Sequence, residues 1–310
     1  MLKFWKKTPA KKPAAAPAPG APRPTWPGTN DACPPAVEVT AGLLSDPGCA
    51  RLVNEDRCYY RQPDDRELLA GKGVLALVAD GIGGHAAGEI ASSKAVEIIA
   101  RVYYESDRPP QAALEEAFHA ANRAIHQAAR QNDRLHGMGT TCTALVIREG
   151  TAYSAQVGDS RLYLVRGGEI FLMSEDHSAV MEMVRQGRMT LEDARRHADK
   201  NIILRALGTQ PEVRVATWKT SFPVRDGDHF VLCSDGLYDL VTDEEIRGRV
   251  TAAEPHPACE KLIALARERG GHDNITVGVL RVRLADAEAE DESATIRETR
   301  ESKLVVSEQG

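Results

Sequence analysis

The sequence predicts an α+β fold in which strands and helices form separate packed layers. Short segments with alternating apolar residues are joined by glycine-containing turns, as in antiparallel hairpins. Two long segments repeat their apolar residues at helical spacing. Strands and helices also follow one another in blocks, whereas a doubly wound parallel sheet would alternate them one by one.

The first elements are a buried strand and two amphipathic helices. Residues 74–79 form a continuous apolar run that ends in Asp80-Gly81, a pattern typical of a buried strand entering a loop. Helices are expected at residues 87–103 and 111–131, where apolar side chains recur every three or four residues.

Four short strands are expected in the middle of the chain, at residues 141–147, 152–157, 161–165 and 169–173. Turns that contain glycine separate them, so the pattern predicts one antiparallel meander.

The later part of the chain returns to longer elements. Residues 175–207 are polar and have a helical pattern with breaks near Gly187 and Asn201. Strands are expected at residues 230–233 and 275–282, and a helix at 257–269 lies between them.

These elements place one continuous domain at residues 36–285. Residues 1–35 are expected to be a disordered basic arm, because the first 30 residues are rich in Pro and Ala and contain six Lys or Arg and no acid. Residues 286–310 contain eight acids and three bases, a net charge of −5, and are expected to be a flexible acidic tail.

Charge and composition argue against several classes of protein. A net charge of −6 over 310 residues, with no broad basic face, argues against a nucleic-acid binder. Neither a membrane-spanning apolar run nor a signal peptide is present, and the six cysteines lack metal spacing, so we expect a cytoplasmic protein with buried free thiols. We also expect a monomer. Leu2, Phe4 and Trp5 beside three lysines offer a weak membrane contact, and a solvated arm is the favoured interpretation.

Four aspartate-bearing motifs are the main functional signal. They are spread over more than two hundred residues, so only a folded core brings them together: Arg51-Leu52-Val53-Asn54-Glu55-Asp56, Asp80-Gly81-Ile82-Gly83-Gly84-His85, Ser234-Asp235-Gly236 and Gly271-His272-Asp273-Asn274. A lone Asp-Gly is more often a turn than a metal site. Carboxylates gathered at several strand ends, however, require a cation, and the absence of His or Cys ligand spacing favours Mg²⁺ or Mn²⁺.

The residues around the aspartates indicate phosphate chemistry. The glycines after Asp80 let the Gly81 carbonyl turn toward a metal, while the Lys-Ser/Thr ending of a nucleotide-binding P-loop is missing. Arg51 presents paired donors suited to phosphoryl oxygens, although a surface ion pair with Glu55 or Asp56 is the alternative. The sequence has no Gly-x-Ser-x-Gly turn, and its Cys-x5-Arg spacing, from Cys142 to Arg148, falls on an expected strand and not on a phosphate loop. Direct attack by a metal-bound water is therefore expected.

The order and spacing of these motifs resemble the metal-dependent protein phosphatases, and within them the bacterial type 2C serine/threonine phosphatases. The resemblance covers residues 38–283 and includes Gly139-Thr140-Thr141, Val157-Gly158-Asp159-Ser160-Arg161, Asp176-His177-Ser178 and Asn201–Gly208 as well as the aspartate motifs. It implies a four-layer α/β/β/α sandwich in which two central antiparallel sheets are flanked by helices.

The resemblance also implies a role for each site residue. Two Mn²⁺ or Mg²⁺ ions would share Asp80, with Asp56, the Gly81 carbonyl, Asp235 and Asp273 as the other ligands. Arg51 would hold the phosphoryl group, and Glu55 and Asn274 would support the ligands and their waters. Asp159 and Asp239 match a weaker third-ion site.

The proton donor is left open by the resemblance. Animal-type members carry a His at the position of Ile82, whereas here His85 comes later. His85, a metal-bound water and no donor at all remain alternatives, and capping of the helix that follows is the favoured role of His85.

The substrates implied are phosphoserine and phosphothreonine proteins, and the expected partner is a cognate bacterial serine/threonine kinase. Residues 174–200 match a mobile flap that would read the substrate protein. An inactive phosphatase fold that only binds phosphoproteins is one rival hypothesis. A hydrolase of small phosphate esters or nucleotides is the other.

Overall fold

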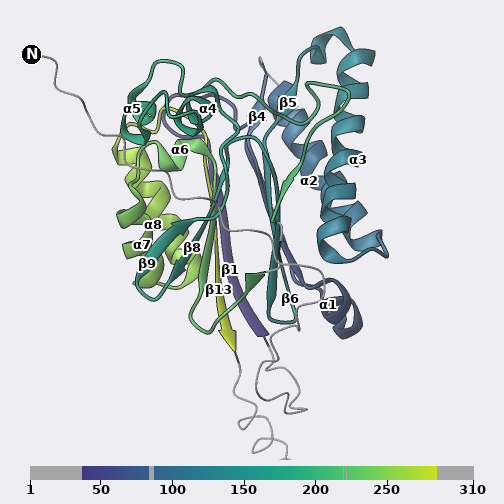
Figure 1. Cartoon of the computed structure of the whole chain (residues 1–310), viewed down its shortest axis with the longest axis vertical. Helices are drawn as coiled ribbons and strands as arrows, with labels where there is room; N and C mark the ends of the chain where they lie inside the picture. Colours follow the sequence, from purple (N-terminus) through teal and green to yellow (C-terminus); the bar gives the residue numbers. More distant parts are fainter. Residues whose placement is uncertain (1–36, 84–86, 219, 221, 285–310) are drawn as a thin grey trace, which may run out of the picture. The chain divides into compact units, whose positions relative to one another are not determined.

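The computed structural model describes residues 37–83, 87–218, 220 and 222–284. In this part of the chain two antiparallel sheets lie between two layers of helices (Figure 1). The predicted four-layer sandwich is therefore confirmed. The basic arm and the acidic tail lie outside the described residues.

The first sheet has five strands and is covered by the C-terminal helices. In spatial order it contains β1 (Val37–Asp46), β13 (Ile275–Leu284), β12 (His229–Cys233), β8 (Arg161–Arg166) and β9 (Glu169–Leu172). Helices α7 (Asp243–Thr251) and α8 (Pro255–Glu268) lie against its outer face (Figure 1).

The second sheet carries the other helical layer. Its order is β10 (Ala216–Thr217), β7 (Thr151–Val157), β6 (Cys142–Arg148), β3 (Val74–Ala79) and β2 (Arg57–Arg61), and β11 (Phe222–Pro223) also pairs with β7. Helices α2 (Ala87–Glu105) and α3 (Pro110–Gln131) cover its outer face. The short helix α1 (Arg66–Lys72) follows β2, and β4 (Gly81–Ile82) pairs with β5 (Gly139–Thr140).

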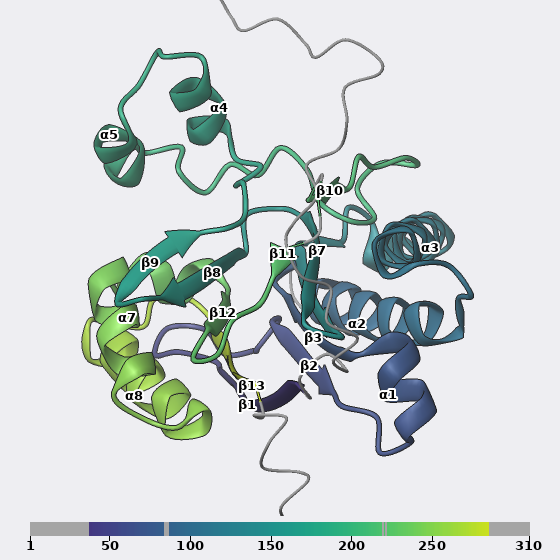
Figure 2. The same cartoon turned by 60° about the horizontal axis from the view of Figure 1, so that its bottom comes forward.

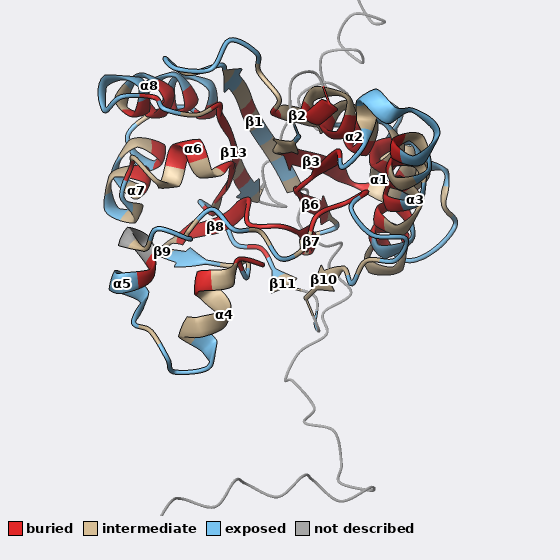
Figure 3. Cartoon of the chain, turned by 90° about the horizontal axis from the view of Figure 1, so that it is seen from above, coloured by how far each residue is buried: buried red, intermediate tan, exposed pale blue. Residues whose placement is uncertain are grey.

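The core explains why β3 is apolar throughout. Alternate residues of a strand point to opposite faces. Leu75 and Leu77 pack with the α2 and α3 layer, whereas Val74, Ala76 and Val78 pack between the two sheets. Both faces are thus buried, as Figure 3 shows for the central strands. The same burial holds the end of β3, and hence Asp80, in a fixed position.

The prediction of a single meander is wrong, because its four strands are divided between the two sheets. Strands β6 and β7 pair in one sheet and β8 and β9 pair in the other. The turn at Gly158-Asp159 carries the chain across. Gly158 has a φ of 104°, and a Cβ there would lie 2.5 Å from the Cβ of Thr141, so only glycine fits this crossing.

The long helical pattern predicted at residues 175–207 is also wrong in extent. Only two short helices form there, α4 (Ala179–Arg185) and α5 (Leu191–Arg196). Few apolar side chains are buried in this segment, and short isolated helices gain little without such packing. Figure 2 shows α4 and α5 standing away from the two sheets.

Within the described ranges, no helix is long and apolar enough to cross a bilayer. The five cysteines described there are all free thiols. Cys142, Cys233 and Cys259 are buried as expected, whereas Cys49 is exposed.

Candidate metal centre

Five aspartates meet at one end of the two sheets because of the strand register. Asp56 precedes β2 and Asp80 follows β3, and these strands pair through Arg57 and Ala79. Asp235 opens the short helix α6 (Asp235–Tyr238) after β12, and Asp273 comes just before β13, which pairs with β12. Asp159 stands in the turn before β8, whose first residue is opposite Cys233 of β12. Antiparallel pairing therefore groups Asp56 with Asp80 in one sheet and Asp159, Asp235 and Asp273 in the other, and charge interactions between the two groups show that they face each other.

The carboxylates lie close enough to repel one another. Burial raises the pKa of Asp80 well above its ordinary value, and the charges of Asp56, Asp235, Asp159 and Asp273 raise it further. Asp235 shows the same pattern, with burial as the first cause. A cluster of this kind is costly in the charged state unless a cation neutralises it.

Two members of the cluster titrate in an accessible range. Burial raises the pKa of Asp56 to about 6, although hydrogen bonds from Ser234 and Thr276 oppose the shift. Burial, followed by the charge of Asp176, raises the pKa of Asp159 to about 7. Shifts of this kind in a group of neighbouring acids are typical of functional sites.

Glu55 and Gly81 also fit a metal centre. The Oε1 atom of Glu55 is buried and has no hydrogen-bond partner in the described part of the chain. Burial is also the first cause that raises the Glu55 pKa. A Cβ on Gly81 would lie 2.3 Å from the Gly88 carbonyl oxygen and 2.6 Å from that of Glu55, so this approach requires glycine. An unpartnered carboxylate oxygen beside such a turn suits a metal-bound water.

Arg51 forms an ion pair with Asp273, one of the residues expected to bind a metal ion. Its Nη2 atom donates to Asp273 Oδ2 at 2.9 Å, so neither Glu55 nor Asp56 is its ion-pair partner. No group of three His, Cys, Asp or Glu side chains within the described ranges forms a ready-made ion site. Magnesium-type ions bind through few carboxylates and several waters, and Asp273 would exchange Arg51 for such an ion.

Asn274 fixes the loop that carries Arg51, Glu55 and Asp56. Its Oδ1 accepts from the Glu55 amide at 2.9 Å. Its Nδ2 donates to the carbonyl oxygens of Pro47 and Val53 at 3.1 and 3.0 Å. Asn274 therefore links the loop before β13 to the backbone of the loop between β1 and β2.

Threonine and serine hydroxyls hold two of the aspartates. The Thr141 amide and the Thr140 hydroxyl both donate to the Asp80 carbonyl oxygen at 2.8 Å. The Gly-Thr-Thr motif therefore fixes the backbone at Asp80. Ser234 Oγ donates to Asp56 Oδ2 at 2.7 Å and accepts from the Thr276 amide at 3.0 Å. The hydrogen bond from Ser234 to Asp56 was not predicted from the sequence. The only sequence feature that could have indicated it is the position of Ser234 directly before Asp235.

The two residues expected at a third ion also lie at this end. Asp159 is buried, and Asp239 follows directly after α6. Lys200 forms an ion pair with Asp239, and His272 Nε2 lies 3.9 Å from Asp239 Oδ2. No sequence pattern indicated Lys200. His85, the candidate proton donor, lies outside the described residues.

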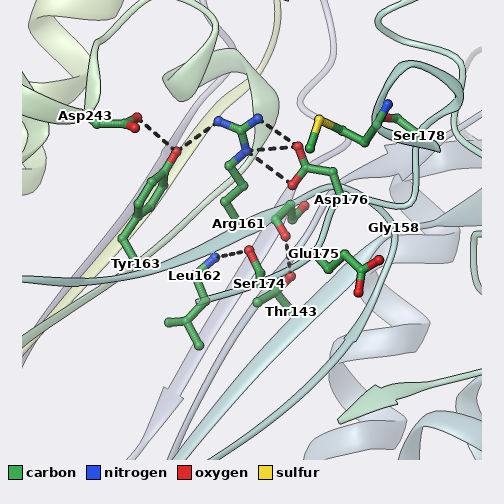
Figure 4. Close-up of polar contacts among 12 residues, drawn as sticks. Thr143, Gly158, Arg161, Leu162, Tyr163, Ser174, Glu175, Asp176, Ser178 and Asp243 are labelled. Carbon is green, nitrogen blue, oxygen red and sulfur yellow. Dashed lines mark hydrogen bonds and ion pairs between the residues drawn. The ribbon is translucent and has the colours of Figure 1, made fainter. Parts of the chain in front are cut away.

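The segment with α4 and α5 is fastened to the site at its base. Arg161 donates to both carboxylate oxygens of Asp176, at 2.7 to 3.2 Å, and to the Tyr163 hydroxyl at 3.0 Å (Figure 4). Arg161 also stacks over the Tyr238 ring at 3.7 Å. The Gly158 amide donates to His177 Nδ1 at 3.0 Å, and the His177 amide donates to the Gly158 carbonyl.

This arrangement predicts a pH dependence for His177. Burial, and then the charges of Arg205 and Arg214, lower the His177 pKa to about 4. The neutral ring is therefore favoured by folding, and its contribution is complete above the unfolded pKa of 6.5 and is lost as the pH falls toward 4. Relative to His177→Gln, the wild-type free energy of unfolding should drop by about 2 kcal/mol between pH 7 and pH 4.5. Urea unfolding at both pH values measures this, and a difference that does not change with pH would contradict it.

Comparison with known proteins places this site in context. A family model described as protein phosphatase 2C matches residues 50–271. Serine/threonine protein phosphatase PstP of Mycobacterium tuberculosis is 40% identical over 238 residues, which are 76% of this chain and 43% of PstP. Protein phosphatase PhpP of Streptococcus pneumoniae is 37% identical over 251 residues, 79% of this chain and 98% of PhpP. The chain thus spans less than half the length of PstP.

Solved structures of the same type superpose on the chain. The catalytic domain of PstP in complex with two manganese ions matches with a TM-score of 0.69 and 36% identity, over 80% of this chain and all of that domain. A serine/threonine phosphatase of S. agalactiae matches with a TM-score of 0.70 and 32% identity, over 79% of this chain and 99% of the other.

Proposed function

The chain belongs to the protein phosphatase 2C family, and we propose that it hydrolyses phosphoserine and phosphothreonine esters of proteins with the help of two Mn²⁺ or Mg²⁺ ions. The observation that carries this proposal is the set of mutually repelling aspartates Asp56, Asp80, Asp235 and Asp273 at one end of the sheets. It is supported by the similarity to a phosphatase structure that contains two manganese ions.

We assign to Asp56, Asp80, Asp235, Asp273 and the Gly81 carbonyl the role of ligands that would hold the ions. Two ions bound there would lower the pKa of a bound water, so that it could lose a proton and provide the hydroxide needed to attack phosphorus. Asn274 and Ser234 keep the ligand backbone and the Asp56 carboxylate in place. Glu55, whose Oε1 has no hydrogen-bond partner among the described residues, would orient a metal-bound water by accepting a hydrogen bond from it.

Arg51 binds the phosphoryl group in this proposal. Its side chain is half exposed, so it is open to a substrate on the solvent side of Asp273. Exchange of the Arg51–Asp273 pair for an ion at Asp273 would leave a free guanidinium beside the site, with paired donors for two phosphoryl oxygens.

An Arg51→Ala variant should therefore lower kcat/KM for a phosphothreonine peptide by about 10²-fold, mostly through a higher KM. Mn²⁺ affinity should stay the same or rise, because Asp273 loses a competing cation. Steady-state kinetics and calorimetric Mn²⁺ titration measure the two effects. The control is Arg101→Ala, which removes an exposed pair with Glu105 on α2 and should change neither. Unaltered kinetics in Arg51→Ala would remove Arg51 from the phosphate site.

Substrate class is tested by comparing turnover on a phosphothreonine protein, a nucleotide and a small aryl phosphate under the same Mn²⁺ concentration. The proposal expects the highest kcat/KM on the protein substrate. A wide margin in favour of the nucleotide or aryl ester would support a small-ester hydrolase. Mn²⁺ binding without phosphate release from any substrate would support a binding protein with a phosphatase fold.

The finer assignments are also proposals. Residues 36–285 form the catalytic domain, and the described strands and helices from Val37 to Leu284 support this boundary. The proposal also includes a cognate serine/threonine kinase, a monomeric state, a cytoplasmic location and a solvated N-terminal arm.

A further inference from the structure

A groove with unpaired arginines lies along one side of α3, and we call it the α3 groove. It has a volume of about 480 Å³, and its lining residues are Arg123, His126, Gln127, Arg130, Gln131 and Pro211. Residues 123, 127 and 130 follow helical spacing, so they share one face of the helix. Arg123 and Arg130 are exposed, and neither forms an ion pair with a described residue.

The loop that forms the other wall of the groove is fixed to α3. The buried Asn122 side chain accepts from the Gly208 amide at 2.8 Å. It also donates to the carbonyl oxygens of Gln210 and Pro211 at 3.1 and 3.2 Å. His126 Nδ1 donates to the Gly208 carbonyl oxygen at 3.0 Å. The groove is therefore preformed, because these hydrogen bonds hold the loop against the helix.

The α3 groove presents positive charge without a compensating acid. None of its lining residues, all of them described, is acidic, and Glu212 next to Pro211 is exposed and outside the lining. The cavity between α7 and α8, by contrast, has Glu268 beside Arg249 and Lys261. An arginine without a carboxylate partner keeps its paired donors available for an anion. The groove therefore suits an acidic ligand, although the whole chain carries a net charge of −6.

The α3 groove is connected to the metal centre through Leu207. Leu207 and Thr140 exchange backbone hydrogen bonds at 2.8 and 3.1 Å, and the Thr140 hydroxyl donates to the Asp80 carbonyl oxygen. Pro211 follows Leu207 by four residues. The route from Asp80 to Pro211 along these contacts is at most about 25 Å long, which roughly eight residues of extended chain cover. One bound peptide can therefore reach both the metal centre and the groove.

We propose that the α3 groove binds an acidic segment of the phosphoprotein substrate, within about eight residues of the phosphorylated Ser or Thr. This inference rests on the proposed phosphatase function and names a class of substrate for it. The metal centre would hold the phosphoryl group, while Arg123 and Arg130 bind carboxylates farther along the same substrate chain. Exposed pairs of this kind are individually weak and are screened by salt. They select among phosphoproteins and leave the chemical step unchanged.

The test compares the steady-state kinetics of the full chain with Mn²⁺ on two kinds of phosphothreonine peptide. Acidic peptides carry a run of glutamates about five to eight residues before or after the phosphothreonine, and neutral peptides carry glutamines there. Wild type should prefer the better acidic peptide by about ten-fold in kcat/KM, through a lower KM at equal kcat. This preference should shrink as the salt concentration rises.

Two groove variants and a matched control make the test specific. Arg123→Glu/Arg130→Glu should abolish the preference and leave kcat/KM for the neutral peptide unchanged, which also shows that the variant is folded. Arg123→Gln/Arg130→Gln is a milder change and should lose most of the preference. Arg249→Glu/Lys261→Glu makes the same change in charge at the cavity between α7 and α8 and should keep the preference.

The outcomes distinguish the groove from the phosphatase function itself. An equal preference in wild type and both groove variants would overturn the role of the α3 groove. Groove variants with a higher kcat/KM on both peptides would identify the chain's own acidic tail, residues 286–310, as the occupant and would also overturn it. Absence of phosphate release from every peptide by wild type would instead contradict the proposed function.

Discussion

An Asp235→Asn chain is expected to lose at least about 10³-fold in kcat/KM toward a phosphothreonine peptide, which corresponds to about 4 kcal/mol of transition-state stabilisation. Asp235 begins α6 directly after a buried strand, so the replacement Asn would occupy the same position but supply no negative charge to the ions. A two-ion centre loses both affinity and geometry when one charged ligand becomes neutral.

The same variant should be more stable than wild type in the absence of metal. Burial and the charges of Asp159 and Asp273 raise the Asp235 pKa well above its ordinary value, so the ionised side chain destabilises the metal-free fold. Removal of that charge relieves the repulsion, in line with the usual conflict between activity and stability at active sites.

Steady-state kinetics with Mn²⁺ and thermal unfolding in a chelator measure the two effects. Asp64→Asn makes the same charge change at an exposed loop position and should leave both quantities unaltered. Turnover of Asp235→Asn at the wild-type rate would show that Asp235 is not a ligand.

An Arg161→Met variant should destabilise the protein by about 3–5 kcal/mol, because it leaves the Asp176 carboxylate buried without a partner. The two side chains are only 9% and 4% exposed. Arg161 also bonds to Tyr163 and stacks on Tyr238, so its loss disconnects the base of the flap lobe, residues 179–202, from α6. Urea unfolding measures the change.

Two further variants make this prediction specific. Arg185→Met removes solvent-exposed ion pairs with Glu175 and Glu182 and should cost less than about 1 kcal/mol. The double variant Arg161→Met/Asp176→Leu should recover most of the lost stability, since it buries no unpaired charge. If Arg161→Met alone were as stable as wild type, the ion pair would not be what holds the base of the lobe.

Local patterns were sufficient to predict much of the fold. The continuous apolar run at residues 74–79 and the helical spacing at residues 111–131 correspond to β3 and α3, because each pattern reflects burial on particular faces. Partner choice between strands was not predictable in this way. Strand β8 has the same local sequence pattern whether it pairs with β7 or with β12. Its pairing with β12 is set by the turn at Gly158, which takes the chain from one sheet to the other.

In the candidate site, too, some residues were predictable from the sequence and others were not. The positions of Asp80 and Asp235 at one end of the sheets were predictable because each comes after a buried strand, whereas the role expected for Asn274 came only from the resemblance to the phosphatase motifs. Their grouping depends on antiparallel register, which pattern alone does not give. Lys200 could not be found from the sequence, since its contact with Asp239 joins two loops that are 39 residues apart.

Diffraction data collected at the manganese absorption edge, from crystals grown with Mn²⁺, test the central claim most directly. The account predicts two strong anomalous peaks about 3.5–4 Å apart, with the Asp80 carboxylate between them and Asp56, Asp235 and Asp273 around them. Arg51 should then be released from Asp273. Peaks that lie elsewhere, or a cluster that stays free of manganese while Arg51 remains on Asp273, would contradict the account.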